Sequence, residues 1–217
     1  MARGTSFGSI HSHQHLSLIQ QSVDVQPAEP KTNYIDIPGV DGSKDFSELP
    51  AGRVVFKDRK ITWTFALYPG DDWHLRHRNV SNLLNGLACK ITLDDDPLYY
   101  YEGRLTVTKY KYTKALRQIV VEAVCRPYKL RQEDTRETAT LTEEYQTLYL
   151  ANERMPVVPT IKLSVPATLR YKGAAISLNA GTFQLEQFAL SAGLNHLEVK
   201  ADSGTGSIAV TYREGAL

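Results

Sequence analysis

The sequence predicts a mainly β protein with a single helix, built as two domains. Three observations predict it. Apolar residues recur with a period of two along most of the chain, one segment has the period of a helix, and a polar stretch breaks the pattern near residue 132. We therefore expect an α+β domain over residues 1–132 and an all-β domain over residues 133–217.

The N-terminal domain is expected to form one sheet. In residues 61–67, Trp63 and Phe65 alternate with threonines, which is typical of a strand with one buried face. Residues 105–112 begin the same way, and simple alternation then places Tyr110 and Tyr112 on the face opposite Val107. Residues 118–125 form a more continuously apolar strand.

The single helix is expected over about residues 72–85. One face is formed by residues spaced 4, 3, 4 and 3 apart: Trp73, His77, Val80, Leu84 and Leu87. Asp71 or Asp72 can cap its first turn, and Gly86 lies where a helix can end.

The C-terminal domain consists of short alternating segments separated by turn residues such as Lys172-Gly173 and Asp202-Ser203-Gly204. The expected strands lie within 138–149, 161–165, 169–171, 176–178, 183–185, 197–199 and 208–212. Short strands at this spacing are typical of a sandwich or barrel.

Composition excludes several classes of protein. Lys and Arg number 25 and Asp and Glu 24, a net charge of +1, which argues against nucleic-acid recognition. No apolar run approaches the ~20 residues that span a bilayer, so we expect no membrane insertion, and residues 1–7 do not begin a signal peptide. Two cysteines, Cys89 and Cys125, are too few for a disulfide framework and are expected to be reduced core thiols.

No motif predicts catalysis, a cofactor or a metal. His11, His13 and His15 would share one side of a strand, but Asp24 is the nearest acidic residue in sequence, so we interpret them as a polar strand face. His74 and His77 lack the glutamate of a zinc helix, and residues 94–96 are interpreted as a turn. A strand pattern follows the glycines of residues 204–209, which excludes a dinucleotide loop.

The candidate interaction residues are tyrosines interleaved with lysines: Tyr99, Tyr100, Tyr101, Tyr110 and Tyr112. Tyrosine is enriched at protein–protein interfaces, so we expect these side chains to make subunit contacts. Ordinary sheet surface and nucleic-acid stacking are the alternatives. Because the net charge is near zero, we expect subunit contacts to come from strand pairing or aromatic packing rather than from opposed charges.

Ordered segments along the chain resemble the distal tail protein (Dit) family of phages with long non-contractile tails. They are residues 5–12, 34–45 (YIDIPGVDGSKD), 59–65, 155–161, 193–197 and 206–215. The resemblance covers nearly the whole chain. The chain is too short for the additional carbohydrate-binding insertion that some members carry.

The resemblance implies a non-enzymatic hub protein of the virion tail tip, made in the host cytoplasm. It implies a homohexameric ring of N-terminal domains and outward-facing, galectin-like C-terminal sandwiches. The implied partners are the tail tube protein, a tail-associated or tail-fibre protein, and the tape measure protein. The alternative is a lectin-like module that contacts the host surface. Asn195, His196 and Arg170 are available for it, although residues 133–217 contain no tryptophan.

Overall fold

The computed structural model describes residues 3–68, 70, 72–112 and 117–217. The chain divides into two compact units, Met1–Lys129 and Leu130–Leu217. The sequence places this boundary near residue 132. The mainly β class with one α-helix is confirmed for the described residues.

The first unit contains one large antiparallel sheet with the strand order β2-β1-β7-β8-β9-β6-β3. Its strands are β1 (Thr5–Phe7), β2 (Ile10–His11), β3 (Leu18–Val25), β6 (Arg59–Leu67), β7 (Ala88–Leu93), β8 (Tyr99–Tyr112) and β9 (Arg117–Cys125). Two further strands, β4 (Tyr34–Asp36) and β5 (Ser43–Asp45), form a separate hairpin. The short strand β10 (Lys129–Arg131) contains the boundary between the units.

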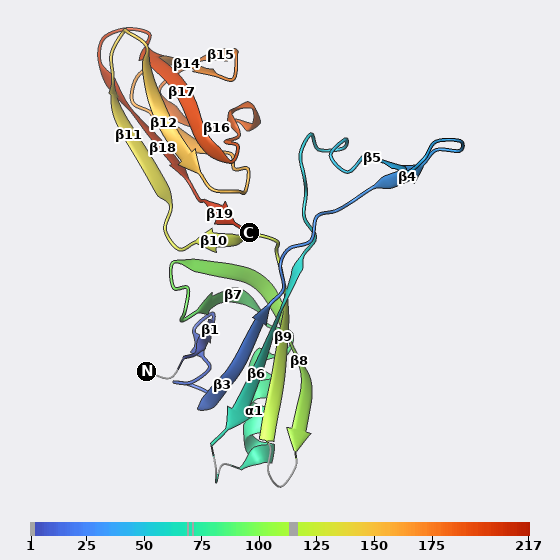
Figure 1. The fold of residues 1–217 in the computed structure, drawn as a ribbon. Coiled ribbons are helices and arrows are strands. Elements are labelled where there is room, and N and C mark those ends of the chain that lie inside the picture. Colours follow the sequence, from blue (N-terminus) through green and yellow to red (C-terminus); the bar gives the residue numbers. More distant parts are fainter. Residues whose placement is uncertain (1–2, 69, 71, 113–116) are drawn as a thin grey trace. The chain divides into compact units, whose positions relative to one another are not determined.

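The helix α1 (Trp73–Leu84) covers one face of this sheet (Figure 1). Strand β6 alternates strictly, so Ile61, Trp63 and Phe65 are fully buried in the core with Val80 and Leu84 of the helix. Burial of these side chains from both layers stabilises the unit.

The ends of α1 follow from its flanking residues. The Asp72 carboxylate accepts a hydrogen bond from Leu75 N at 3.1 Å, which satisfies one free amide of the first turn. After Leu84 the backbone becomes extended at Asn85, and Gly86 takes a φ of 85°, a conformation that glycine adopts without strain. The helix lies within the predicted range of 72–85.

A β-bulge corrects the alternation predicted for β8. The register with β9 shifts between Val107 and Lys109, and Tyr110 then pairs with the fully buried Ile119. The extra residue returns Tyr110 to the helix side of the sheet, rather than to the face opposite Val107. The side chain of Tyr112, the second tyrosine of this prediction, lies outside the described part of the structure.

The second unit is a sandwich of two four-stranded antiparallel sheets, with the orders β11-β18-β13-β16 and β12-β17-β14-β15. The strands are β11 (Thr135–Leu141), β12 (Gln146–Asn152), β13 (Thr160–Leu163), β14 (Ala167–Tyr171), β15 (Ala174–Leu178), β16 (Gly181–Gln184), β17 (Gly193–Ala201) and β18 (Gly206–Tyr212). A short 3-10 helix, Glu186–Phe188, and strand β19 (Gly215–Ala216) complete the unit. Both sheets contribute to one core, for example Leu169 and Val199 from one and Ile161 and Val210 from the other.

Among the described residues, no helix combines the length and the hydropathy needed to cross a bilayer.

Candidate assembly interface

Three of the predicted contact tyrosines lie at the start of β8 and are packed within the first unit. Tyr100 and Tyr101 are only 2% and 6% exposed, and Tyr99 is half-buried. The ammonium groups of Lys90 and Lys129 lie 4.3 Å and 4.5 Å from the ring centroids of Tyr100 and Tyr99. These rings therefore stabilise the unit itself and leave little surface for a partner.

Tyr110 is different, because its side chain is 61% exposed. Its ring centroid lies 4.7 Å from that of His77 and 6.1 Å from that of Trp73, both on α1. The helix and the bulged strand therefore hold an exposed aromatic ring in a fixed place, as a contact surface requires.

Cationic residues lie on the same elements as this ring, at one end of the first unit. We define the basic end by five residues of α1, β8 and β9: Arg76, Arg78, Lys109, Lys111 and Arg117. The neighbouring Leu75 is 45% exposed, so this end also carries apolar surface. In Figure 1 it lies where α1 begins, at the lower end of the sheet.

An extended segment between β3 and β6, which we call the arm (residues 26–58), leaves the opposite end of the same sheet (Figure 1). Its two legs are paired by backbone hydrogen bonds: Gln26 N to Lys60 O at 3.0 Å, Lys57 N to Glu29 O at 2.7 Å, Lys31 N to Val55 O at 2.8 Å and Phe46 N to Asn33 O at 2.8 Å. The arm therefore continues the β3–β6 ladder outward and ends in the β4–β5 hairpin.

The arm exposes apolar side chains: Tyr34 at 59%, Ile35 at 47%, Val40 at 52% and Leu49 at 76%. An isolated two-stranded hairpin has no core of its own and is marginally stable in water. These side chains are consequently available to pack against another surface.

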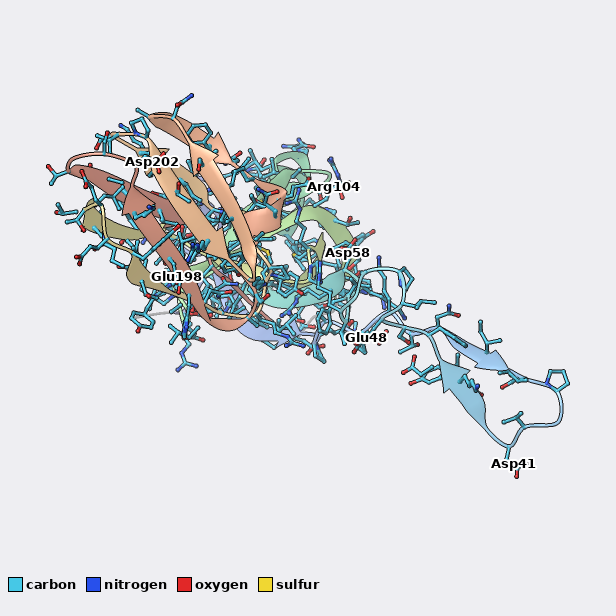
Figure 2. The ribbon with its side chains drawn as sticks, turned by 90° about the horizontal axis from the view of Figure 1, so that it is seen from above. Asp41, Glu48, Asp58, Arg104, Glu198 and Asp202 are labelled. Carbon is cyan, nitrogen blue, oxygen red and sulfur yellow. The ribbon has the colours of Figure 1, made fainter. Side chains whose placement is uncertain are left out.

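The far part of the arm is acidic. Residues 33–49 contain four carboxylates and one lysine, a charge of −3, and Asp41 lies at its tip (Figure 2). Hydrogen bonds from the hydroxyl and the amide of Ser47 hold the pKa of Asp45 below its usual value, so this carboxylate stays charged. The Pro38-Gly39 and Asp41-Gly42 pairs are typical of turns, but nothing in the sequence indicates that the hairpin lies outside the sheet.

The histidine triplet does not form the strand face that the sequence predicts. His11 Nδ1 accepts the backbone amides of His13 and Gln14 at 3.2 Å each, and His15 Nδ1 accepts the amide of His11 at 2.8 Å. The rings therefore organise a turn after β2, and His11 Nε2 lies 3.2 Å from Asp94 Oδ2. Across the described residues, no group of three or more His, Cys, Asp or Glu side chains is placed to hold a metal ion.

The two cysteines lie in one cross-strand row of β7, β8 and β9, on either side of Gly103. Cys89 and Cys125 both pair with Gly103, and a Cβ atom at Gly103 would come within 2.5 Å of Cys125 Sγ. Burial raises the pKa of the Cys125 thiol to about 12 and also raises that of Cys89. Both are free thiols with low reactivity at neutral pH.

Comparison with known proteins bears on the fold. No family model matches the sequence, and no curated protein matches it significantly. The crystal structure of SPP1 Dit (gp 19.1), described as a paradigm of hub adsorption apparatus in phages that infect Gram-positive bacteria, is similar over 98% of this chain and 99% of that chain, with a TM-score of 0.65 and 15% identity.

The chain has the Dit fold. The likeness extends over both units, so the resemblance to Dit inferred from the ordered segments is confirmed at the level of the fold. A designed double-stranded β-helix aligns with 38% of the chain at a TM-score of 0.28, which is too low to indicate a shared fold.

Proposed function

We propose that the protein is a non-enzymatic, structural hub component at the distal end of a long phage tail, and that six copies form a closed ring. The fold likeness to SPP1 Dit over almost the whole chain supports a hub role. The exposed, acidic arm is the main observation in support of the ring. Its apolar side chains are exposed in the single chain, so a partner surface is needed to cover them.

The arm and the basic end are complementary in two respects. Residues 33–49 carry a net charge of −3, whereas the basic end has five cationic side chains against the two acidic residues, Asp71 and Asp72, that precede α1 in sequence. Both surfaces also expose apolar side chains, Tyr34 and Leu49 on the arm and Leu75 and Tyr110 at the basic end. Buried apolar contact would supply affinity, and opposed charges would fix the partner and its orientation.

The two surfaces lie at opposite ends of the sheet of the first unit (Figure 1), so the arm meets the basic end of a second copy. A contact between two different surfaces is heterologous and passes from copy to copy until the rotation closes a ring. Tyr110, which is exposed at the basic end, is the predicted tyrosine that we assign to this contact.

In the virion this ring would join the tail tube protein to a tail-associated or tail-fibre protein, with the tape measure protein as a further partner. These partners rest on the role of Dit as a hub. The first unit would form the ring, and the second unit, a galectin-like sandwich, would face outward.

Multi-angle light scattering of the purified chain tests the ring. Six copies of the 24.3 kDa chain have a mass of about 146 kDa. We expect this mass for the chain alone or after addition of its tail-tube and tail-associated partners. A mass near 24 kDa under all of these conditions would overturn the proposal.

A further inference from the structure

The outer face of the β12-β17-β14-β15 sheet carries a compact cluster that the proposed ring does not use. Its members are Tyr149 on β12, His196 and Glu198 on β17, and Arg170 on β14. Tyr149 pairs directly with His196, and Arg170 pairs directly with Glu198, so the four side chains occupy two adjacent rows of one face. Figure 2 labels Glu198 on this sheet.

The aromatic part of the cluster is open to solvent. Tyr149 is 61% exposed, and its ring forms a T-shaped pair with His196, with centroids 5.1 Å apart and an interplanar angle of 77°. The imidazole holds the phenol ring in place while most of the tyrosine side chain stays open to solvent. A planar ring presented in this way can stack on the C–H face of a sugar ring.

The charged part of the cluster is unusual because two opposite charges face each other without pairing. Within the described residues, no hydrogen bond or ion pair joins Arg170 to Glu198, although they are opposite in register. The Arg170 guanidinium instead lies 4.0 Å from the ring centroid of Tyr145. A fixed donor and a neighbouring acceptor are therefore both available to a ligand.

Both groups line a shallow cavity of 290 Å³ with Lys172, Ala175 and His196. This volume lies just below the range of about 300–1,000 Å³ for small-molecule sites. The cavity therefore suits a ligand of one or two rings.

We propose that this face binds a neutral saccharide with vicinal hydroxyl groups, a function beyond the proposed ring. One hydroxyl group of the sugar accepts a hydrogen bond from Arg170, and the adjacent hydroxyl group donates one to Glu198. The C–H face of the sugar ring stacks on Tyr149. Neighbouring hydroxyls supply an acceptor and a donor side by side, which matches the unpaired guanidinium and carboxylate. The Glu198 carboxylate only accepts hydrogen bonds, so it favours a ligand that donates one, as a hydroxyl group does.

Binding of the full chain to four immobilised neutral probes tests this site: lactose, maltohexaose, cellohexaose and chitotetraose. We expect at least one probe to bind, and we expect Tyr149→Ser, Arg170→Ala and Glu198→Ala each to weaken that binding by about tenfold or more. Tyr149→Phe keeps the stacking surface and should bind like the wild type. Lys162→Ala, which removes an exposed cation from the other sheet, is the matched control.

The proposal is wrong if none of the four probes binds, or if the three cluster variants bind as tightly as Lys162→Ala. Circular dichroism on every variant separates lost binding from lost folding. Light scattering on the same samples separates failure of the saccharide site from failure of the ring, because the cluster variants should keep the wild-type mass.

Discussion

The indole N–H of Trp63 donates a hydrogen bond to Thr5 Oγ1 at 3.0 Å, inside the core of the first unit. The Thr5 hydroxyl in turn donates to Gln20 Oε1 at 2.7 Å, and the Thr5 amide donates to Ser12 Oγ at 3.0 Å. Trp63 and Thr5 are both fully buried. Strand β1 is therefore joined to the core by a satisfied polar network as well as by packing.

Replacing Thr5 with valine should test the value of this network. Valine keeps the shape of threonine but leaves the Trp63 N–H buried without a partner, so we expect the free energy of unfolding to fall by about 1–3 kcal/mol. Urea denaturation measures the change. Thr62→Val, on the uncovered face of β6, is the control and should change stability by less than about 0.5 kcal/mol. Equal stability of the two variants would contradict the structural role of the Trp63–Thr5 bond.

The packing of α1 predicts a contrast between two adjacent leucines. Leu84 is fully buried, whereas Leu83 is 48% exposed. Leu84→Asp would bury a carboxylate among apolar side chains and should cost several kcal/mol, enough to unfold a typical domain. Leu83→Asp should remain folded, with a cooperative thermal transition close to that of the wild type. A soluble Leu84→Asp protein that unfolds cooperatively would show that this helix face is not packed on the sheet.

The features predicted best from the sequence depend on local periodicity. The strict alternation of residues 61–67 is compatible only with a half-buried strand. Strand β6 ends where predicted and begins two residues earlier. The spacing from Trp73 to Leu84, with Asp72 before it, similarly determines α1 and its first turn. Local propensity and tertiary packing agree at these places.

The features that the sequence did not predict depend on the surroundings of a segment in the folded protein. The bulge between Val107 and Lys109 adds one residue without any sequence signature, and it changes the side of the sheet on which Tyr110 lies. Tyr100 and Tyr101 have the composition of an interface, but lysine and arginine side chains of the same unit cover them. The hairpin at residues 34–45 has the same turn chemistry whether it lies in a sheet or, as here, on an arm.

Burial of Cys125 predicts a pH dependence of stability. Its folded-state pKa of about 12 lies above the ordinary value of 9.0, so the folded protein keeps the thiol protonated where the unfolded chain begins to ionise. The resulting contribution to stability is present in full below pH 9 and is lost as the pH rises from 9 to 12. We expect the unfolding free energy of the wild type to fall more steeply between pH 9 and 11 than that of Cys125→Ala. Parallel slopes for the two proteins would rule out this contribution.

The near-zero net charge is the sum of acidic and basic segments that are separate from each other. The total of +1 favours subunit contacts without opposed charges, but residues 33–49 carry a net charge of −3 and the basic end has five cationic side chains, with Asp71 and Asp72 preceding α1 in sequence. Net charge describes solubility and long-range repulsion, and local contacts depend on where the charges lie. This separation makes a direct test of the arm contact possible.

Reversing two charges of the arm should weaken assembly. Asp41→Lys with Glu48→Lys changes the charge of residues 33–49 from −3 to +1 and spares Asp36 and Asp45, whose carboxylates accept hydrogen bonds from serines of the arm. Exposed ion pairs contribute about 0.2–1 kcal/mol each, so two reversals should raise the concentration at which the ring forms by about tenfold. Sedimentation velocity over a dilution series measures this concentration.

The matched control carries the same change of net charge on the second unit, as Glu133→Lys with Glu144→Lys, two exposed positions outside the arm. It should assemble like the wild type, because only the location of the charges differs.

Arg78→Glu with Lys111→Glu at the basic end should weaken the wild-type ring and restore part of the assembly of the arm variant, since both partners are then reversed. Raising the salt concentration should weaken the wild-type ring and affect the arm variant less. Equal effects of the arm and control reversals would mean that the arm does not meet the basic end, and absence of rescue would mean that it meets another surface.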